Sequence, residues 1–164
     1  MAKKPSGKSQ SGRQVLATNR KARHNYSILE VFEAGMVLLG TEVKSLRDGK
    51  ASLVEAYATV DDGEVWLRNL HIPEYHHGSW TNHDPRRNRK LLLHRRQIDG
   101  LIGKIKENNL ALVPLSLYFF EGKVKVELAL ARGKQAHDKR QDMAKRDAQR
   151  EVLRELGRRA KGMT

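Results

Sequence analysis

The residues best suited to chemistry lie in two short polar stretches, one toward each end of the chain. Residues 19–26 read Asn-Arg-Lys-Ala-Arg-His-Asn-Tyr, which places three cations, an imidazole, two amides and a phenol ring together. Residues 133–140 read Gly-Lys-Gln-Ala-His-Asp-Lys-Arg and add a carboxylate to a similar set. Cations and amides bind phosphate oxygens and aromatic rings stack on bases, so both stretches are suited to holding RNA. The plainer alternatives are a solvated basic arm for 19–26, and for 133–140 a polar linker with a helix cap at Asp138.

Two acids interrupt an otherwise apolar run that follows the first polar stretch. Glu30 and Glu33 lie within residues 28–39, which are rich in Val, Ile, Leu and Phe. Phosphates repel a carboxylate, whereas a base edge or a 2′-hydroxyl can donate a hydrogen bond to it. Each acid is therefore either a solvent-facing residue that keeps a strand soluble or a group that reads RNA.

The sequence shows no pattern typical of an enzyme. The chain has no cysteine, which excludes disulfides, thiolate metal ligands and cysteine nucleophiles. It has no phosphate-binding glycine loop, nucleophile elbow or HExxH motif. His76, His77 and His83 share a long loop at residues 74–88, but no supporting ligand pattern accompanies them, so we expect no metal and no cofactor. Tyr75 and Trp80 of this loop are either stacking platforms or rings packed under it.

The positive charge is concentrated at the two ends of the chain. The net charge of the 164 residues is +13. Residues 1–25 contain seven cations and no acid, and residues 138–164 contain nine cations and five acids, whereas residues 26–137 are nearly neutral. A third cluster lies inside the body and consists of Arg86, Arg87, Arg89, Lys90, Arg95 and Arg96. Separate basic clusters on a neutral body suit a folded polyanion that is contacted at several places.

No apolar run approaches the length of about 20 residues that crosses a bilayer. The basic N-terminus is not followed by the apolar segment of a secretory signal. We therefore expect a cytoplasmic protein without a membrane partner, and we expect it to be a monomer.

Hydrophobic periodicity predicts a small, mainly β, antiparallel barrel of about six strands with flanking helices. The expected elements are a strand over 28–39 with a bulge or bend at 33–35, a short helix over 40–50, a hairpin of strands 53–60 and 64–70, a strand over 91–93, a helix over 94–108, and a hairpin of strands 110–120 and 122–131. No βαβ alternation is present. The chain is long enough for one ordinary core.

This pattern divides the chain into three parts. Residues 1–18 are expected to be a flexible basic arm, residues 19–132 an RNA-binding barrel, and residues 133–164 a basic tail. The tail is predicted to form a helix from about 138 to 159, with a narrow apolar stripe that is too thin to dock on the barrel. We therefore predict that the tail is disordered when free and helical when bound.

Seven stretches in order resemble the SmpB family of bacterial SsrA-binding proteins. They are residues 19–26, Phe32 to Gly35, Glu42 to Arg47, Gly49 to Ala51, Asp84-Pro85 with Arg89 to Leu93, Leu115 to Tyr118, and Gly133-Lys134 with His137 to Arg140. The resemblance implies an oligonucleotide-binding (OB)-like barrel. It also implies a non-enzymatic adaptor that binds the tRNA-like domain of transfer-messenger RNA (tmRNA, or SsrA RNA). With elongation factor Tu and GTP, such an adaptor delivers tmRNA to stalled ribosomes for trans-translation, in which the nascent chain is tagged and the ribosome is rescued.

The resemblance also implies two sets of contact residues. The tmRNA-binding set is Asn19, Arg20, Lys21, Arg23, His24, Tyr26, Glu33, Lys44, Arg47, Arg89 and Lys90. The tail is implied to fill the empty decoding centre and mRNA channel of the small subunit, through Gly133, Lys134, His137, Asp138, Lys139 and Arg140. Two alternatives remain open at this point: a general single-strand-binding barrel and an RNA-processing enzyme.

Overall fold

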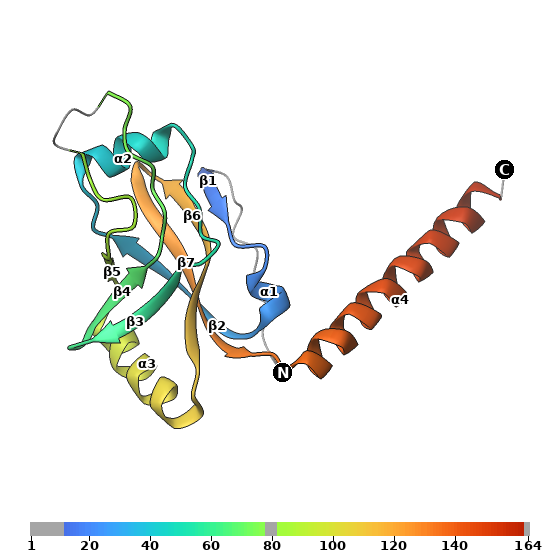
Figure 1. The fold of residues 1–164 in the computed structure, drawn as a ribbon. Coiled ribbons are helices and arrows are strands. Elements are labelled where there is room, and N and C mark those ends of the chain that lie inside the picture. Colours follow the sequence, from blue (N-terminus) through green and yellow to red (C-terminus); the bar gives the residue numbers. More distant parts are fainter. Residues whose placement is uncertain (1–11, 78–81, 163–164) are drawn as a thin grey trace.

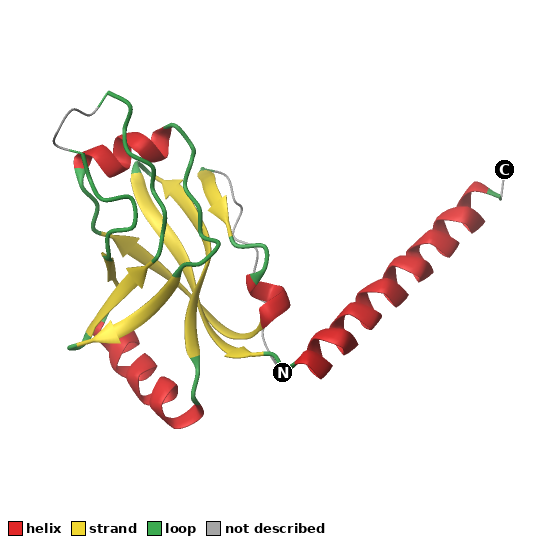
Figure 2. Ribbon diagram, viewed as in Figure 1, coloured by secondary structure: helices red, strands yellow, loops and turns green. Residues whose placement is uncertain are grey.

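The computed structural model describes residues 12–77 and 82–162, and its centre is an antiparallel β-barrel with helices around it (Figures 1 and 2). The strands are β1 (Arg13–Thr18), β2 (Tyr26–Met36), β3 (Tyr57–Asp61), β4 (Glu64–Arg68), β5 (Arg89–Leu92), β6 (Ala111–Phe120) and β7 (Lys123–Gly133). The helices are α1 (Ala22–Asn25), α2 (Gly40–Arg47), α3 (Arg95–Asn108) and α4 (Ala136–Lys161). The predicted class, an antiparallel barrel of about six strands with flanking helices, is confirmed.

The strand order is β1-β6-β3-β4-β5-β2-β7, and a further pairing of β6 with β7 closes the sheet. Strand β6 is long enough to use one edge twice. Its first half pairs with β3 at Leu112, and its second half pairs with β1 from Ser116 to Phe120. Strand β1 therefore completes an edge of β6 that the short β3 leaves open.

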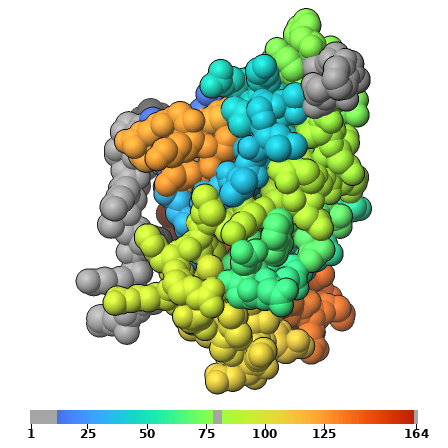
Figure 3. Space-filling model, turned by 90° about the vertical axis from the view of Figure 1, so that its left-hand side faces the viewer, coloured from blue at the N-terminus to red at the C-terminus, as the bar shows by residue number. Residues whose placement is uncertain are grey.

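Alternating side chains fill the barrel, as the sequence pattern predicted. On β7, Val124, Val126, Leu128 and Leu130 all point into the main core. Helix α3 covers one end of the barrel and buries Ile98 and Leu101, and α2 buries Leu46 near the other end. Figure 3 shows α2, the β3–β4 hairpin and α3 on one continuous face of the molecule. Burial of apolar surface at about 25 cal/mol per Å² is the main force that holds such a body together.

A second, smaller apolar cluster lies on the outer face of the sheet, underneath α1. It consists of Ala22, Val113, Leu115, Ala129 and Ala131. The small alanines of β7 let the single turn of α1 approach the strands closely. This cluster is what holds the basic residues around α1 in place.

Two local predictions are wrong. Residues 13–18, assigned to the flexible arm, form β1, because the free edge of β6 pairs with them. The β2 bulge lies between Ile28 and Glu30, whereas residues 33–35 pair regularly with β7. The glycine at position 35 is explained by packing instead: a Cβ at this position would lie 3.4 Å from the Cβ of Leu92 on β5.

Helix α4 extends away from the barrel as a single rod (Figure 1). Its 26 residues span about 39 Å at 1.5 Å per residue. None of them is buried. Within the described parts of the chain, no helix is both long and apolar enough to cross a membrane. The predicted disorder of the free tail stays a prediction.

Candidate nucleic-acid interface

The basic turn around α1 is fixed to the barrel by Asn19. Strand β6 has a bulge between Pro114 and Ser116. The Asn19 side-chain amide donates to the Pro114 carbonyl at 3.0 Å, and its backbone N–H donates to the Leu115 carbonyl at 2.8 Å. Asn19 therefore acts first as a clamp that places the cations after it.

The cations of this turn face solvent. Arg20, Lys21 and Arg23 are exposed, while His24 is half-buried. A groove of about 260 Å³ runs beside them and is lined by Asn19, Lys21, Asn25, Tyr26 and Tyr57, among others. Cations, amides and two rings around one groove can hold a phosphate and stack a base.

Glu33 is the centre of a polar cluster on the outer face of β1, β6, β7 and β2. Its Oε2 accepts hydrogen bonds from the Tyr118 hydroxyl at 2.6 Å and from Arg13 Nη2 at 3.2 Å. Its Oε1 accepts from Lys125 Nζ at 2.8 Å. The Arg13 guanidinium also lies over the Tyr118 ring, 4.5 Å from the ring centre. One carboxylate thus positions two cations on the open sheet face.

The electrostatics of the cluster keep Glu33 charged. The hydrogen bond from Lys125, followed by that from Tyr118, lowers the pKa of Glu33, and the charges of Lys125 and Arg13 act in the same direction. Burial and the adjacent carboxylate raise the pKa of Tyr118, which therefore remains a hydrogen-bond donor. Both oxygens of Glu33 are already in use, so its main action is to orient Arg13 and Lys125 rather than to read a base alone.

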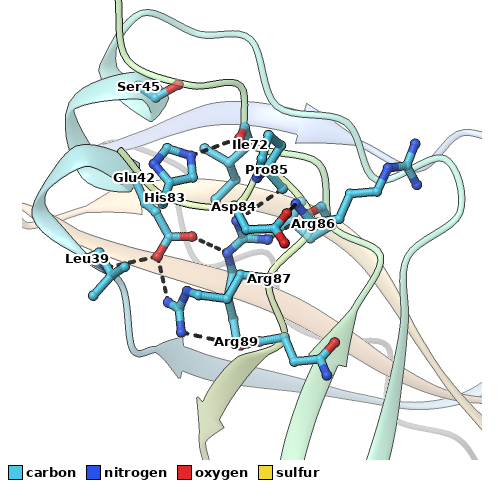
Figure 4. Close-up of polar contacts among 12 residues, drawn as sticks. Leu39, Glu42, Ser45, Ile72, His83, Asp84, Pro85, Arg86, Arg87 and Arg89 are labelled. Carbon is cyan, nitrogen blue, oxygen red and sulfur yellow. Dashed lines mark hydrogen bonds and ion pairs between the residues drawn. The ribbon is translucent and has the colours of Figure 1, made fainter. Parts of the chain in front are cut away.

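Arg89 was predicted to contact RNA, but the structure buries it. Its side chain is 0% exposed and forms a buried ion pair with Glu42, whose side chain is also 0% exposed. Arg89 further donates to the carbonyls of Leu70 at 2.6 Å and Pro85 at 3.2 Å. Figure 4 shows Glu42 between Arg89 and Arg87, at the base of the loop that follows β4. The guanidinium therefore fastens α2 to this loop and has no surface for RNA.

The same region holds the predicted loop histidine, His83. It is buried, and its Nδ1 lies 3.0 Å from the Thr41 hydroxyl, while its Nε2 lies 2.9 Å from the Ile72 carbonyl. A carbonyl only accepts, so Nε2 carries the proton and the ring ties the loop to α2. Among the residues that the structure describes, no three side chains are arranged to hold a metal ion. Trp80 lies outside the described residues.

The remaining cations of the predicted tmRNA set lie near α2 and on β5. Lys44 and Arg47 are exposed on α2, and the Lys44 ammonium is 5.8 Å from the centre of the Tyr75 ring. Lys90 is 39% exposed and pairs with Glu64 at 2.9 Å. These three residues remain open to a polyanion, but they lie away from the α1 groove. The structure therefore does not bring the predicted set together at one spot.

The predicted decoding-centre residues lie where the barrel passes into α4. Gly133 still belongs to β7 and pairs with Tyr26. Lys134 is only 10% exposed, donates to the Arg23 carbonyl at 3.1 Å, and forms an ion pair with Asp142 of α4. It is therefore a joint between α1 and the tail more than a surface contact.

The start of α4 also differs from the predicted cap at Asp138. Gln135 is the N-cap, and Asp138, three residues into the helix, accepts from the Gln135 N–H at 3.4 Å. His137 is exposed and its Nδ1 lies 3.1 Å from Asp138. Arg140 is exposed as well and Lys139 is half-buried. His137, Asp138 and Arg140 can thus reach a partner, and they do so from a helix.

Sequence reasoning missed several residues that the fold adds to the interface. Tyr118 joins Glu33 because β6 and β2 both pair with β7, and Arg13 joins them because β1 pairs with β6. Lys125 reaches Glu33 from β7, and nothing near either residue in the sequence joins the two. Tyr57 is 44% exposed and lines the α1 groove together with Tyr26. No local signal could have found it, since 31 positions separate the two tyrosines.

Comparisons with known proteins agree with this picture. Residues 16–158 match the family model described as SmpB protein. The SsrA-binding protein of Mycolicibacterium vanbaalenii is 79% identical over 164 residues, covering 100% of this chain and 99% of that protein. The SsrA-binding protein of Mycobacterium tuberculosis strain H37Rv is 83% identical over 156 residues, covering 95% and 98%. A solved structure described as "tmRNA-SmpB: a journey to the center of the bacterial ribosome" matches with a TM-score of 0.61 and 53% identity, covering 75% of this chain and 90% of that one.

Proposed function

The chain belongs to the SmpB family, and from this we propose that it binds the tRNA-like domain of tmRNA and delivers it to stalled ribosomes for trans-translation. The single observation that carries the proposal is the 79% identity to an SsrA-binding protein over the full length of the chain. The description of the solved relative names tmRNA and the bacterial ribosome, which supports the same partners for this chain.

The outer face of the barrel supplies the tmRNA contacts. The turn before and within α1 offers Arg20, Lys21 and Arg23 to phosphates, and Tyr26 offers a ring to an unstacked base. Glu33 acts through the two cations that it orients, Arg13 and Lys125. Further contacts come from His24 and from Lys44, Arg47 and Lys90.

The tail supplies the ribosome contacts. Helix α4 is long, basic and without buried residues, so it suits a narrow channel lined by rRNA phosphates. The exposed residues at its start, among them His137 and Arg140, contact the decoding centre, and the rest of the helix follows the empty mRNA path. The barrel of residues 19–132 and the tail of residues 133–164 thus divide the work, with the helix ordered by its partner.

The proposal extends to the other partners of the protein, its oligomeric state and its location. Elongation factor Tu with GTP accompanies the complex through the tmRNA rather than through a site on the barrel. The protein performs no catalytic step, takes no cofactor, and acts as a monomer in the cytoplasm.

Two measurements test the proposal. The first is competition binding, in which the protein should prefer the tRNA-like domain to an unstructured strand of equal length; equal affinity would leave a general single-strand-binding barrel. The second compares a triple alanine variant of Asp138, Lys139 and Arg140 with the unchanged protein. The variant should keep tmRNA affinity and lose tagging on stalled ribosomes. Loss of both functions together would refute the division between barrel and tail.

A further inference from the structure

A second groove lies next to the α1 groove on the barrel. It has a volume of about 600 Å³ and lies between β3, the start of β6 and α3. Tyr26, Tyr57 and Val113 line both grooves, so the two lie side by side. Tyr57 stands where the two meet.

The groove exists because β3 and β6 barely pair. They share a single residue pair, Ala58 with Leu112, and the gap beyond it is covered by α3. The covering side chains, Ile102 and Ile105, are only half-buried. An apolar floor is therefore left open to solvent beside a basic turn.

The chemistry of the lining points to a flat, uncharged ring attached to an anionic chain. The floor is apolar, and the Tyr57 ring is 44% exposed at the junction. Lys21 lines the α1 groove beside Glu55, and Lys106 lines the second groove beside Asp62, so each groove has one cation that can meet a phosphate. The volume of about 600 Å³ falls within the range of about 300–1,000 Å³ that is usual for ligand sites.

We infer that this groove takes an unstacked base of the tRNA-like domain of tmRNA, with Tyr57 as its stacking platform. The inference rests on the proposed function, and the position beside the α1 groove is the reason for choosing this RNA. Lys21 and Tyr57 line the same groove, so a strand with a phosphate at Lys21 can place a neighbouring base at Tyr57. Bases of single-stranded loops can be splayed out and stacked in this way, whereas bases inside a helix cannot.

The first test compares ring removal with ring retention. Tyr57→Ala should weaken binding of the tRNA-like domain by about 5- to 150-fold, the usual effect of losing one stacked base. Tyr57→Phe keeps the ring and should bind like the unchanged protein. If Tyr57→Ala binds the tRNA-like domain as tightly as the unchanged protein does, no base stacks on Tyr57 and the inference is refuted. The proposed function would still stand, provided that the unchanged protein prefers the tRNA-like domain.

A second variant fills the groove without touching Tyr57. Ile105→Trp places a large ring in the floor and should weaken binding as Tyr57→Ala does, while Asn108→Trp, on the exposed part of the same helix, should not. Circular dichroism confirms that both variants are folded. Equal affinities for Ile105→Trp and Asn108→Trp would show that no base enters the groove.

The source of the base is identified by crosslinking. A photoreactive p-azidophenylalanine at position 57 of the full chain, irradiated on stalled ribosomes with tmRNA, should label a nucleotide in the tRNA-like domain. A crosslink to small-subunit rRNA instead would overturn this assignment. If the unchanged protein shows no preference for the tRNA-like domain in competition binding, the proposed function itself fails, and that outcome is read before any variant is compared.

Discussion

The buried ion pair of Glu42 and Arg89 gives the sharpest prediction, because the sequence placed Arg89 on RNA and the fold places it in the interior. Both side chains are 0% exposed. Glu42 also accepts from Arg87 at 2.6 Å and from the Leu39 N–H at 2.9 Å. Glu42→Ala would leave the Arg89 guanidinium buried, with only the carbonyls of Leu70 and Pro85 as partners.

The size of the effect follows from the burial. Removing one partner of a buried ion pair lowers the free energy of unfolding by about 3–5 kcal/mol, because the other charge is left uncompensated. In a domain of 150–250 residues each kcal/mol lowers the melting temperature by about 2–4 °C. Glu42→Ala should therefore melt about 6–20 °C below the unchanged protein.

Urea unfolding followed by circular dichroism measures this loss. The matched control is Glu30→Ala, which breaks an exposed pair with Lys104, with side chains 45% and 49% exposed; such pairs contribute about 0–1 kcal/mol. The double variant Glu42→Ala/Arg89→Met should recover much of the stability, because it removes both buried charges. If Glu42→Ala costs no more than Glu30→Ala, or if the double variant is no better than the single one, Arg89 is not held in the way described.

The same pair predicts a pH dependence. Burial alone would raise the pKa of Glu42, but the hydrogen bonds from Leu39, Arg87 and Arg89 outweigh it and leave the pKa lowered. A carboxyl with a lowered folded pKa contributes stability that is full above its ordinary value of 4.5 and is lost as the pH falls through the folded value. The difference in unfolding free energy between the unchanged protein and Glu42→Gln should therefore shrink below about pH 4.5. A difference that stays constant down to pH 3 would contradict the charge on Glu42.

Two other predictions concern the interface. Tyr118→Phe removes one donor from Glu33 and should raise the Glu33 pKa toward its ordinary value, measured by NMR titration, while weakening tmRNA binding by at most about tenfold, as expected for one hydrogen bond; an unchanged pKa would mean that the Tyr118 bond is not formed. Asp142→Ala frees Lys134 and should widen the distance distribution between spin labels on the barrel and on α4, whereas Asp147→Ala, one turn further along, should not. Equal distributions for these two variants would show that the ion pair does not direct the helix.

The sequence predicted those parts of the fold that depend on near neighbours. The β6–β7 hairpin and α3 were readable because their apolar residues repeat at periods of two and about 3.6 within a single segment. Strand β1 was not readable, since residues 13–18 become a strand only on the free edge of β6, about 100 positions later. The prediction that Arg89 contacts RNA was wrong for the same reason. In the sequence Arg89 belongs to a basic run, and its partner Glu42 is 47 positions away.

The candidate interface was predicted in kind but not in arrangement. The α1 turn was found from its composition, because cations, amides and a ring lie within eight residues. Glu33 was singled out correctly as unusual, yet its role came from Arg13, Tyr118 and Lys125, which reach it from three other strands. Composition identifies groups that can bind RNA, and only the closed barrel decides which of them share a face.

The stretch 133–140 is not a free polar linker in the structure, because it connects β7 to α4 almost directly. Strand β7 runs through Gly133, paired with Tyr26, and α4 begins at Ala136. Only two residues remain between strand and helix, and Lys134, one of them, is bound on both sides: its N–H donates to the Asn25 carbonyl at 2.9 Å and its ammonium joins Arg23 to Asp142. The tail therefore leaves the barrel in a direction set by α1, the same turn that exposes Arg20, Lys21 and Arg23. A displacement of α1 would move the two carbonyls that hold Lys134, and through Lys134 it would act on Asp142 in the first turns of α4.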